Sequence, residues 1–433
     1  MEAVLGDVTP VIAEIDHALQ HLEAWMKPQR VPTPLLQQPA RSEIIREPKG
    51  VVLTLTPWNF PVNLPLMSLV AVLSAGNCCL LKPSEVSPRS AALLAKLVPQ
   101  YLDREAVVVI TGGVPESTAL LALRWDHIFF TGNGAIGRTV MEAAAKHLTP
   151  CTLELGGKSP TVVLLGANIG VAARRILSGK CFNAGQICIS PDYILVHRDM
   201  EEALVQELRR VLASWYTADA ANSKSFGRIV DERHWDRIMA LLKASGGEVL
   251  ALGTPSRADR FIPPTLVRGP APDSALMTEE IFGPLLPILR MDSLDAIVER
   301  INADEKPLAL YIFGPEAAAS EIIRRTSSGG VCVNDTIFQV ANPDLPFGGV
   351  GGSGMGHYHG KFGFDEMSHV RGVMYRKTWV DPAIRYPPFN EANLRLFQKV
   401  MVGPLLPTGL KTALTGTAVA VAGAAALAIR SRL

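Results

Sequence analysis

Short apolar runs alternate with segments of helical length over most of the chain, and this alternation restricts the fold more than any other feature. Each run has the length of a strand and is apolar enough to be buried on both faces, while the segments between carry helical spacing. Strands that alternate with helices in this way favour parallel sheets covered by helices. We therefore predict an α/β fold with doubly wound parallel sheets. The strand-like runs of the first series lie at residues 50–57, 77–83, 106–112, 127–132 and 151–155.

Breaks in this alternation divide the chain. A second series begins near Lys158 and runs to about Pro346, and a glycine-rich segment then precedes a further strand at residues 369–377. With 433 residues the chain has room for two or three domains. We predict a first α/β domain at residues 1–157, with a strand contribution near residues 43–56 to a small β arm, a second α/β domain at 158–346, the arm and its return at 347–380, and a tail at 381–433.

Charge and cysteine content exclude several classes of protein. The 42 basic and 41 acidic residues nearly cancel, so the chain lacks the basic excess of a nucleic-acid binder. None of the six cysteines forms a CxxC pair, and their spacing provides neither a disulfide framework nor a zinc site. We therefore predict an intracellular protein in a reducing compartment, with no metal site and no nucleic-acid partner.

The C-terminal tail carries an apolar segment. Residues Thr412 to Ile429 contain no charged side chain and are just long enough to span a bilayer as a helix. Their richness in alanine, glycine and threonine leaves an alternative, a helix docked on the protein or on a partner. The chain ends in Ser431-Arg432-Leu433, which resembles the peroxisomal targeting signal SKL. We predict a C-terminal hydrophobic helix at residues 412–429 that attaches the protein to a membrane.

One cysteine is distinguished by its neighbours. Cys188 lies in the stretch FNAGQICIS, Phe182 to Ser190, directly after a glutamine and an isoleucine that follow a glycine. An isolated intracellular cysteine is usually a small buried hydrophobe. It acts as a nucleophile only where a base and an oxyanion donor accompany it. The rest of the chain therefore decides between the two interpretations.

Residues at the ends of other strand-like runs can supply such groups. Glu154 follows a strand and precedes two glycines, where backbone can approach closely and the side chain can move. Asn59 ends another strand and carries an amide that can stabilise an oxyanion. Further candidates, at a strand terminus or in a loop ahead of a strand, are Lys82, Glu85, Glu280 and Phe282. Taken singly, Lys82 and Glu85 would be read as a surface pair and Glu280 as a helix-capping acid, and only their order together with Cys188 favours a site.

A glycine pattern follows another strand. Gly132, Gly134 and Gly137 form a literal G-x-G-x-x-G that opens a helix, and Glu154 falls near the position of a ribose-binding acid. That spacing is typical of a dinucleotide-binding site. An acid followed at once by two glycines, however, fits a mobile carboxylate near the chemistry better than a ribose ligand. We therefore assign Glu154 to the chemistry.

Together these segments resemble a known family. They occur in the order and approximate spacing of the aldehyde dehydrogenases. The sequence around Glu154 and the glycine-rich segment most resemble the class 3 branch, which includes the fatty aldehyde dehydrogenases with a hydrophobic C-terminal tail. The likeness covers roughly Pro48 to Lys377. The matching stretches are TPWNFP, LLKPSE, FFTGNGAIG, LELGGKSP, FNAGQICIS, EEIFGP and LPFGGVGGSGMG.

The resemblance implies a role for each candidate. Cys188 would be the nucleophile, Glu154 the general base, and Asn59 the oxyanion donor together with the backbone N–H of Cys188. Glu280 would hold the nicotinamide ribose, and Phe282 would pack near the nicotinamide. The remaining cofactor contacts would be Lys82 and Glu85 at the adenosine ribose and, at the phosphates, Gly132, Asn133, Gly134, Ala135, Ile136 and Gly137.

The resemblance also implies an activity. Residues 1–157 would bind NAD, with NADP as an alternative, residues 158–346 would be catalytic, and the arm would join two copies in a homodimer. The substrates would be aldehydes, medium- to long-chain fatty aldehydes in particular, oxidised to carboxylic acids through a cysteine thiohemiacetal and thioester. The residue types agree independently, because a thiolate attacks carbonyl carbon well and leaves well from a thioester.

Two alternatives remain open at this point. An acylating dehydrogenase would pass the thioester to coenzyme A, but Glu154 favours hydrolysis, which needs a base. A catalytically impaired, membrane-tethered scaffold is disfavoured because all the catalytic residues are present. The tail predicts membrane association with the active site facing the cytosol. The endoplasmic reticulum is the expected location, and the terminal tripeptide makes the peroxisome the alternative.

Overall fold

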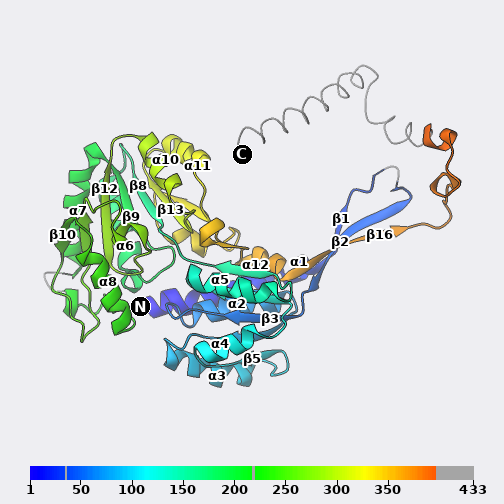
Figure 1. Cartoon of the computed structure of the whole chain (residues 1–433), viewed down its shortest axis with the longest axis horizontal. Coiled ribbons are helices and arrows are strands. Elements are labelled where there is room, and N and C mark those ends of the chain that lie inside the picture. Colours follow the sequence, from blue (N-terminus) through cyan, green and yellow to red (C-terminus); the bar gives the residue numbers. More distant parts are fainter. Residues whose placement is uncertain (35–36, 217–219, 396–433) are drawn as a thin grey trace, which may run out of the picture. The chain divides into compact units, whose positions relative to one another are not determined.

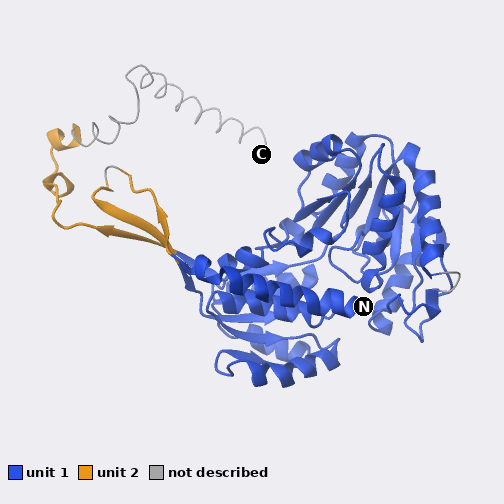
Figure 2. Ribbon diagram, turned by 180° about the vertical axis from the view of Figure 1, so that it is seen from behind, with its two compact units in different colours: residues 1–27, 46–370 blue, residues 28–45, 371–433 orange. Residues whose placement is uncertain are grey.

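The computed structural model describes residues 1–34, 37–216 and 220–395. The first of two units consists of Met1–Lys27 and Arg46–Val370, and the second of the described residues in Pro28–Ile45 and from Arg371 onward (Figure 2). The predicted apolar helix at residues 412–429 and the terminal tripeptide lie outside the described residues. Within the described ranges, no helix is both long and apolar enough to cross a membrane.

The first unit contains a six-stranded sheet in the order β15-β7-β6-β3-β4-β5. Neighbouring strands are parallel, except that β15 pairs antiparallel with β7. This arrangement confirms the predicted parallel sheet. Its strands are β3 (Val51–Leu55), β4 (Cys78–Lys82), β5 (Val107–Val109), β6 (His127–Thr131), β7 (Cys151–Glu154) and β15 (Gly354–Met355). The helices between them are α2 (Asn63–Ser74), α3 (Pro88–Tyr101), α4 (Val114–Leu121) and α5 (Gly134–Ala145) (Figure 1).

The strand order of this sheet reverses beside β3. The chain runs from β3 outward through β4 and β5, then returns to β6 on the other side of β3 and continues to β7. Ligands of such sheets bind at the carboxyl ends of the strands next to the reversal. Leu55 pairs with Lys82 and with Phe130. Thr131 pairs with Glu154, so the strands that carry the predicted site residues end at one edge of the sheet.

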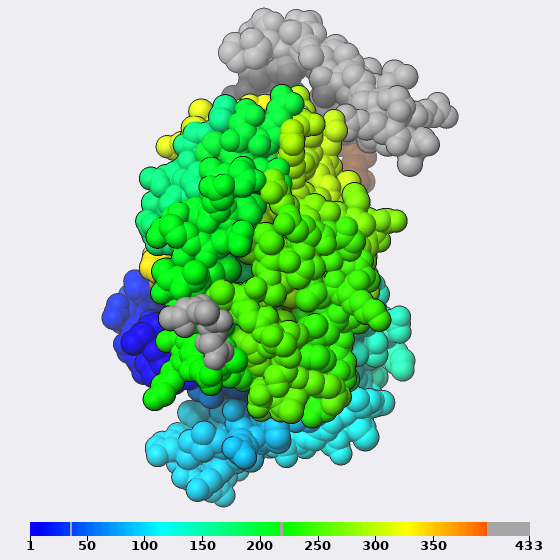
Figure 3. Space-filling view, turned by 90° about the vertical axis from the view of Figure 1, so that its left-hand side faces the viewer, coloured from blue at the N-terminus to red at the C-terminus, as the bar shows by residue number. Residues whose placement is uncertain are grey.

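A second, seven-stranded sheet follows in the order β10-β11-β12-β9-β8-β13-β14. Its neighbouring strands are parallel, except that β10 pairs antiparallel with β11. The strands are β8 (Pro160–Val163), β9 (Tyr193–His197), β10 (Glu248–Ala251), β11 (Thr265–Arg268), β12 (Leu285–Met291), β13 (Ala309–Phe313) and β14 (Gly330–Val333). The helices are α6 (Ile169–Cys181), α7 (Glu201–Tyr216), α8 (Glu232–Lys243), α9 (Ala275–Thr278), α10 (Leu294–Ala303) and α11 (Glu316–Arg325). The green and yellow segments of this part form a continuous surface on the side seen in Figure 3.

Alternate residues of the central strands face different helices. On β9, Ile194 and Val196 are buried with the apolar residues of α6 and α7. Tyr193 and Leu195, one position away on the same strand, are buried with those of α10 and α11. Successive side chains of a strand point to opposite faces, so a strand covered on both faces reads as a continuous apolar run. The sheet is therefore covered by helices on both faces, as predicted.

The six-stranded sheet is covered in the same way. Val52 and Phe129 are buried with residues of α1 (Thr9–Met26), α2 and α12 (Gly360–Glu366). Leu53 and Ile128 are buried with residues of α4 and α5. Both sheets thus have the two-sided helical cover that the sequence predicts.

The second unit holds most of a three-stranded sheet in the order β1-β2-β16. The strands are β1 (Gln29–Val31), β2 (Ala40–Pro48) and β16 (Ser368–Arg376). The guanidinium of Arg41 lies over the ring of Tyr375, 4.3 Å from its centroid. The predicted strand at residues 369–377 is confirmed. The predicted domain boundaries stay a prediction, because both large sheets fall within the first unit.

Candidate active site

The loop that carries Cys188 begins with a turn in an unusual backbone conformation. Helix α6 ends at Cys181, and Asn183, Ala184 and Gly185 have φ values of 50°, 52° and 76°. Residues with a side chain rarely adopt positive φ, and such positions persist only where the surroundings fix them. A Cβ on Gly185 would lie 2.3 Å from the carbonyl oxygen of Gly283, so the turn also needs glycine there.

The side chain of Gln186 fixes this turn. Its Nε2 donates to the carbonyl oxygens of Asn183 and Arg228 at 2.9 and 3.0 Å. Its Oε1 accepts a hydrogen bond from the backbone N–H of Val230 at 3.0 Å. Gln186 is buried, so each of these bonds satisfies a backbone group that has little access to water. The amide therefore connects the turn to the segment that precedes α8.

Asn59 lies against the same turn. Its Nδ2 donates to the carbonyl oxygen of Gln186 at 3.1 Å, and its own carbonyl oxygen accepts from Nδ2 of Asn183 at 2.8 Å. Asn59 follows β3 of the six-stranded sheet, whereas Asn183 precedes β9 of the seven-stranded sheet. An amide nitrogen has two donor hydrogens, so the bond to Gln186 leaves one for an oxyanion.

The loop that carries Cys188 is held on its other side by a tyrosine. The hydroxyl of buried Tyr311 on β13 donates to the carbonyl oxygen of Ile189 at 2.6 Å. The pKa of Cys188 is raised to about 12, mainly by burial and then by the charges of Glu280 and Glu154. The resting thiol is therefore neutral near pH 7. Because the thiolate is the nucleophile, a neighbouring base has to accept the proton.

Glu154 is the last residue of β7 and is buried, with 2% of its surface exposed. Neither carboxylate oxygen has a hydrogen-bond partner among the described residues. The pKa of Glu154 is raised well above its usual value, first by burial and then by the charge of Glu366. A buried carboxyl with a raised pKa and unused lone pairs can hold a water molecule and accept its proton.

The carboxylate of Glu280 occupies the space beside the glycines that follow Glu154. A Cβ on Gly156 would lie 2.1 Å from Oε2 of Glu280. Oε1 of Glu280 is buried and has no partner within the described part of the chain. Burial, and then the charge of Asp192, raises the pKa of Glu280 to about 8. Next to it, the ring of Phe282 packs edge-on against Trp58 with centroids 5.4 Å apart.

Lys82 and Glu85 lie at the carboxyl end of β4. The Nζ of buried Lys82 donates to Oε2 of Glu85 and to the carbonyl oxygen of Pro83, both at 3.3 Å. The side chain of Glu85 is half exposed, at 50%. The structure therefore brings this predicted pair together, with the carboxylate open to solvent.

The three glycines of the G-x-G-x-x-G pattern serve different purposes in the structure. A Cβ on Gly132 would lie 2.5 Å from the ring of Phe130, and one on Gly137 would lie 2.8 Å from Leu155. These two glycines are needed for packing. A Cβ on Gly134 would meet the end of a flexible arginine at 3.6 Å, so backbone is accessible there. Asn133 caps α5, since its side chain accepts from the N–H of Ile136 at 3.0 Å, and Ala135 lies in the same first turn.

Comparison with known proteins decides the family. Residues 1–373 match the model of the aldehyde dehydrogenase family. The chain belongs to this family. Aldehyde dehydrogenase family 3 member H1 of Arabidopsis thaliana is 45% identical over 93% of this chain and 84% of its own length. The dimeric, NADP-preferring aldehyde dehydrogenase of Rattus norvegicus is 45% identical over 88% and 84%. The substrate bound structure of Staphylococcus aureus AldH matches with a TM-score of 0.89 and 39% identity, over 93% of this chain and 88% of that one.

This aldehyde dehydrogenase is an NAD(P)-dependent oxidoreductase. Its family 3 relatives confirm the resemblance to the class 3 branch. The roles of the individual residues stay predictions, which the geometry described above supports.

The predicted contacts fit a dinucleotide. The unpartnered Oε1 of Glu280 is a buried acceptor suited to ribose hydroxyls, and the open backbone at Gly134 begins a twelve-residue helix, where N–H groups favour phosphate. Lys82 adds a donor at the end of β4 in the same sheet. These residues, with Glu85 and Phe282, would hold NAD or NADP, which supplies the acceptor for hydride.

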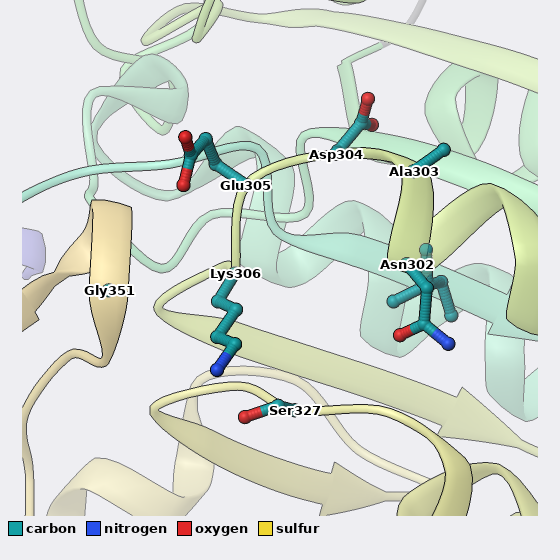
Figure 4. Close-up of a pocket in the computed structure, with 8 residues that line it drawn as sticks. Asn302, Ala303, Asp304, Glu305, Lys306, Ser327 and Gly351 are labelled. Carbon is teal, nitrogen blue, oxygen red and sulfur yellow. The ribbon is translucent and has the colours of Figure 1, made fainter. Parts of the chain in front are cut away.

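A cavity of about 410 Å³ lies away from these residues, at the end of α10 (Figure 4). Its charged lining groups are Asp304, Glu305 and Lys306, and Gly351 of the glycine-rich segment lies at its edge. None of the predicted site residues lines it. We therefore assign this cavity no part in the reaction.

Sequence reasoning missed the residues that hold the site in place. Gln186 lies two residues before Cys188, but nothing in the local sequence indicates that its amide reaches Val230. Tyr311 lies in an apolar strand and has the pattern of a core residue. Glu366, whose charge acts on Glu154, lies at the end of a helix far along the chain and gave no signal.

Proposed function

We propose that this enzyme oxidises medium- to long-chain fatty aldehydes to carboxylic acids through a thioester on Cys188. The observation that carries the proposal is the meeting of three segments at one loop. Cys188 lies on the loop, the Asn59 amide donates to the loop carbonyl of Gln186, and the charge of Glu154 is one of the causes that raise the pKa of the Cys188 thiol. NAD or NADP, when bound, accepts hydride.

The first half of the reaction makes the thioester. Because the pKa of Cys188 lies far above neutrality, a base has to accept the thiol proton as the sulfur attacks, and this proton passes to solvent before the second half begins. The sulfur then forms a bond to the carbonyl carbon of the aldehyde, and the carbonyl oxygen becomes an oxyanion. The Asn59 Nδ2–H and the backbone N–H of Cys188 donate to this oxygen. Loss of hydride re-forms the carbonyl and leaves the acyl group on sulfur.

The second half of the reaction releases the acid. Ionised Glu154 accepts a proton from water as the water oxygen attacks the thioester carbon. The C–S bond then breaks, the sulfur takes up the proton held by Glu154, and the carboxylic acid leaves, so the thiol and the ionised carboxylate are both restored. The absence of a hydrogen-bond partner for either oxygen of Glu154 within the described residues supports this role, because both oxygens can receive water.

The finer parts of the proposal concern substrate, assembly and location. Resemblance to the class 3 branch and the apolar segment 412–429 support long-chain substrates that are met at a membrane. The dimeric relative from Rattus norvegicus, and the exposed apolar side chains Val370, Met374 and Tyr375 on β16, support a homodimer joined through the three-stranded arm. We further propose attachment to the endoplasmic reticulum with the active site in the cytosol, and the peroxisome as the alternative.

A kinetic panel tests the activity. Aldehydes from acetaldehyde to octadecanal are compared with NAD and with NADP, and kcat/KM should be highest for the longer chains. The Cys188→Ala variant should lose about 10⁴-fold or more of the turnover while binding NAD normally. The Glu154→Gln variant should show a burst of NADH and then stop as the acyl-enzyme, seen by mass spectrometry. Turnover of Cys188→Ala above a few per cent, or an acyl-coenzyme A product, would contradict the proposal.

A further inference from the structure

A chain of polar side chains ends beside the candidate base. Nζ of Lys49 lies 3.1 Å from Nδ1 of His127, and Nε2 of His127 lies 2.8 Å from Oγ1 of Thr152. Oγ1 of Thr152 donates to Oε1 of Glu366 at 2.7 Å. His127 and Thr152 are fully buried, while Lys49 and Glu366 are partly buried. The four residues come from four separate parts of the chain: the approach to β3, the start of β6, the middle of β7 and the end of α12.

The donor and the acceptor of each hydrogen bond in this series are fixed. An ammonium group can only donate, so Nδ1 of His127 accepts from Lys49. The pKa of His127 is lowered to about 3 by burial and then by the charge of Lys49, so the ring is neutral. Its one N–H is therefore on Nε2 and donates to Thr152, whose hydroxyl donates to Glu366. All three bonds point from the cation toward the carboxylate, so Glu366 is the final acceptor of this series of hydrogen bonds.

Glu366 lies along the same strand face as the candidate base. Thr152 and Glu154 are two residues apart on β7, so their side chains leave the strand on the same face. A Cβ on Gly356 would lie 2.6 Å from Oε1 of Glu366, so the glycine leaves room for this carboxylate. The charge of Glu366 is also a cause, after burial, of the raised pKa of Glu154.

Two further titratable groups among the described residues feel the charge of Glu154. The Cys188 thiol and the hydroxyl of buried Tyr358 both have raised pKa values, with burial as the largest cause and the charge of Glu154 as a further one. Neither brings a positive charge. Lys49, the cation in this series of hydrogen bonds, lies at the end remote from Glu154. It is connected to Glu366 through His127 and Thr152. The described charge that acts on Glu154 is therefore that of Glu366, a carboxylate.

We propose that Glu366 is a positioning residue that controls the proton on Glu154. Its charge, held by the Thr152 hydroxyl and the chain to Lys49, opposes ionisation of the base and so sets the pH range in which the acyl-enzyme is hydrolysed. This inference rests on the proposed role of Glu154 in deacylation. It assigns to Lys49 the opposite effect, because a cation at the far end offsets the charge of Glu366.

The test is the pH profile of acyl-enzyme hydrolysis in stopped flow, after the NADH burst. Glu366→Gln keeps the acceptor for Thr152 and removes the charge. The acidic limb of the pH–rate profile of this variant should therefore move to lower pH. At a pH on that limb, its acyl-enzyme should be hydrolysed at least about three times as fast as that of the wild type. Glu366→Asp keeps the charge and should return the limb toward the wild type. Lys49→Met should move the limb to higher pH.

The neighbouring carboxylate provides the control. Asp365 pairs with Arg46 at 2.5 Å and with Lys361, and the Asp365→Asn variant should leave the limb where it is. A structural role alone would not move the limb in opposite directions for Glu366→Gln and Lys49→Met.

Separate readouts distinguish the two levels of the proposal. If the wild type forms no burst and no acyl-enzyme, the proposed function fails, and this inference fails with it. If the burst is intact and the limbs of Glu366→Gln and the wild type coincide, the inference alone is overturned. If Glu366→Gln does not fold, Lys49→Met decides, since an unmoved limb or a shift to lower pH in that variant also overturns it.

Discussion

Replacing Gln186 by methionine should weaken the fold by about 3 kcal/mol. The amide makes three hydrogen bonds, to the carbonyl oxygens of Asn183 and Arg228 and from the N–H of Val230, at 2.9 to 3.0 Å. Each such bond contributes about 1 kcal/mol net, and a buried N–H left without a partner costs about 1–3 kcal/mol. Methionine is similar in length to glutamine, so the loss of packing should be small.

An exposed glutamine provides the matched control. Gln206 on α7 donates to Glu202 at 2.9 Å, and the Gln206→Met variant should stay within about 0.5 kcal/mol of the wild type. The free energy of unfolding is compared from urea midpoints, with m held equal between variants. The same variants are tested for the rate of the NADH burst. Only Gln186→Met should slow it, because the turn of left-handed residues before Cys188 loses its support.

The outcome that refutes this reasoning is specific. A Gln186→Met variant that loses less than about 1 kcal/mol and keeps a normal burst would show that the turn holds without its amide. Equal losses for Gln186→Met and Gln206→Met would show that the effect belongs to methionine rather than to the position.

Three further predictions follow from the site and the tail. Because the pKa of Cys188 is raised to about 12, its alkylation by iodoacetamide should accelerate about tenfold per pH unit above neutrality, and a plateau below about pH 9 would contradict this. Gly156→Ala would place a Cβ 2.1 Å from Oε2 of Glu280, so calorimetry should show weaker NAD binding with nearly unchanged stability; unchanged affinity would remove Glu280 from the cofactor site. A variant truncated near Pro404 should leave the membrane fraction and lose kcat/KM on long-chain aldehydes only. Deleting Ser431-Arg432-Leu433 alone should change the location of the enzyme only if the tripeptide is a targeting signal.

The sequence predicted the strands and helices well, for a physical reason. Strands covered by helices on both faces are continuous apolar runs, so β3, β4, β6 and β9 stand out without knowledge of their neighbours. It also predicted that site residues lie at strand ends, because ligand sites of parallel sheets form there. Which strand ends meet is set by pairing between distant segments, and the roles of Cys188 and Glu154 came from the family resemblance.

What the sequence could not supply were contacts over long separations. Gln186 bonds Val230, and Tyr311 bonds the carbonyl oxygen of Ile189, although neither pair is close in the chain. No periodicity or capping rule relates such positions. Glu366 reaches β7 from the end of α12 through Thr152, and a helix-terminal glutamate is most often a surface residue.

The bonds of Asn59 to Gln186 and from Asn183 have a consequence for the analysis of variants. The residue that would stabilise the oxyanion also helps to hold the loop that carries the nucleophile. Replacing the side chain of Asn59 removes the oxyanion donor and the bond to the Gln186 carbonyl together, whereas the bond from Asn183 to the Asn59 backbone remains. The kinetic effects of Asn59 and Gln186 variants should therefore be strongly non-additive in a double-mutant cycle. The loss of rate in an Asn59 variant then reports two effects together. One is the weaker stabilisation of the oxyanion, and the other is the lost contact between the segment after β3 and the loop before β9.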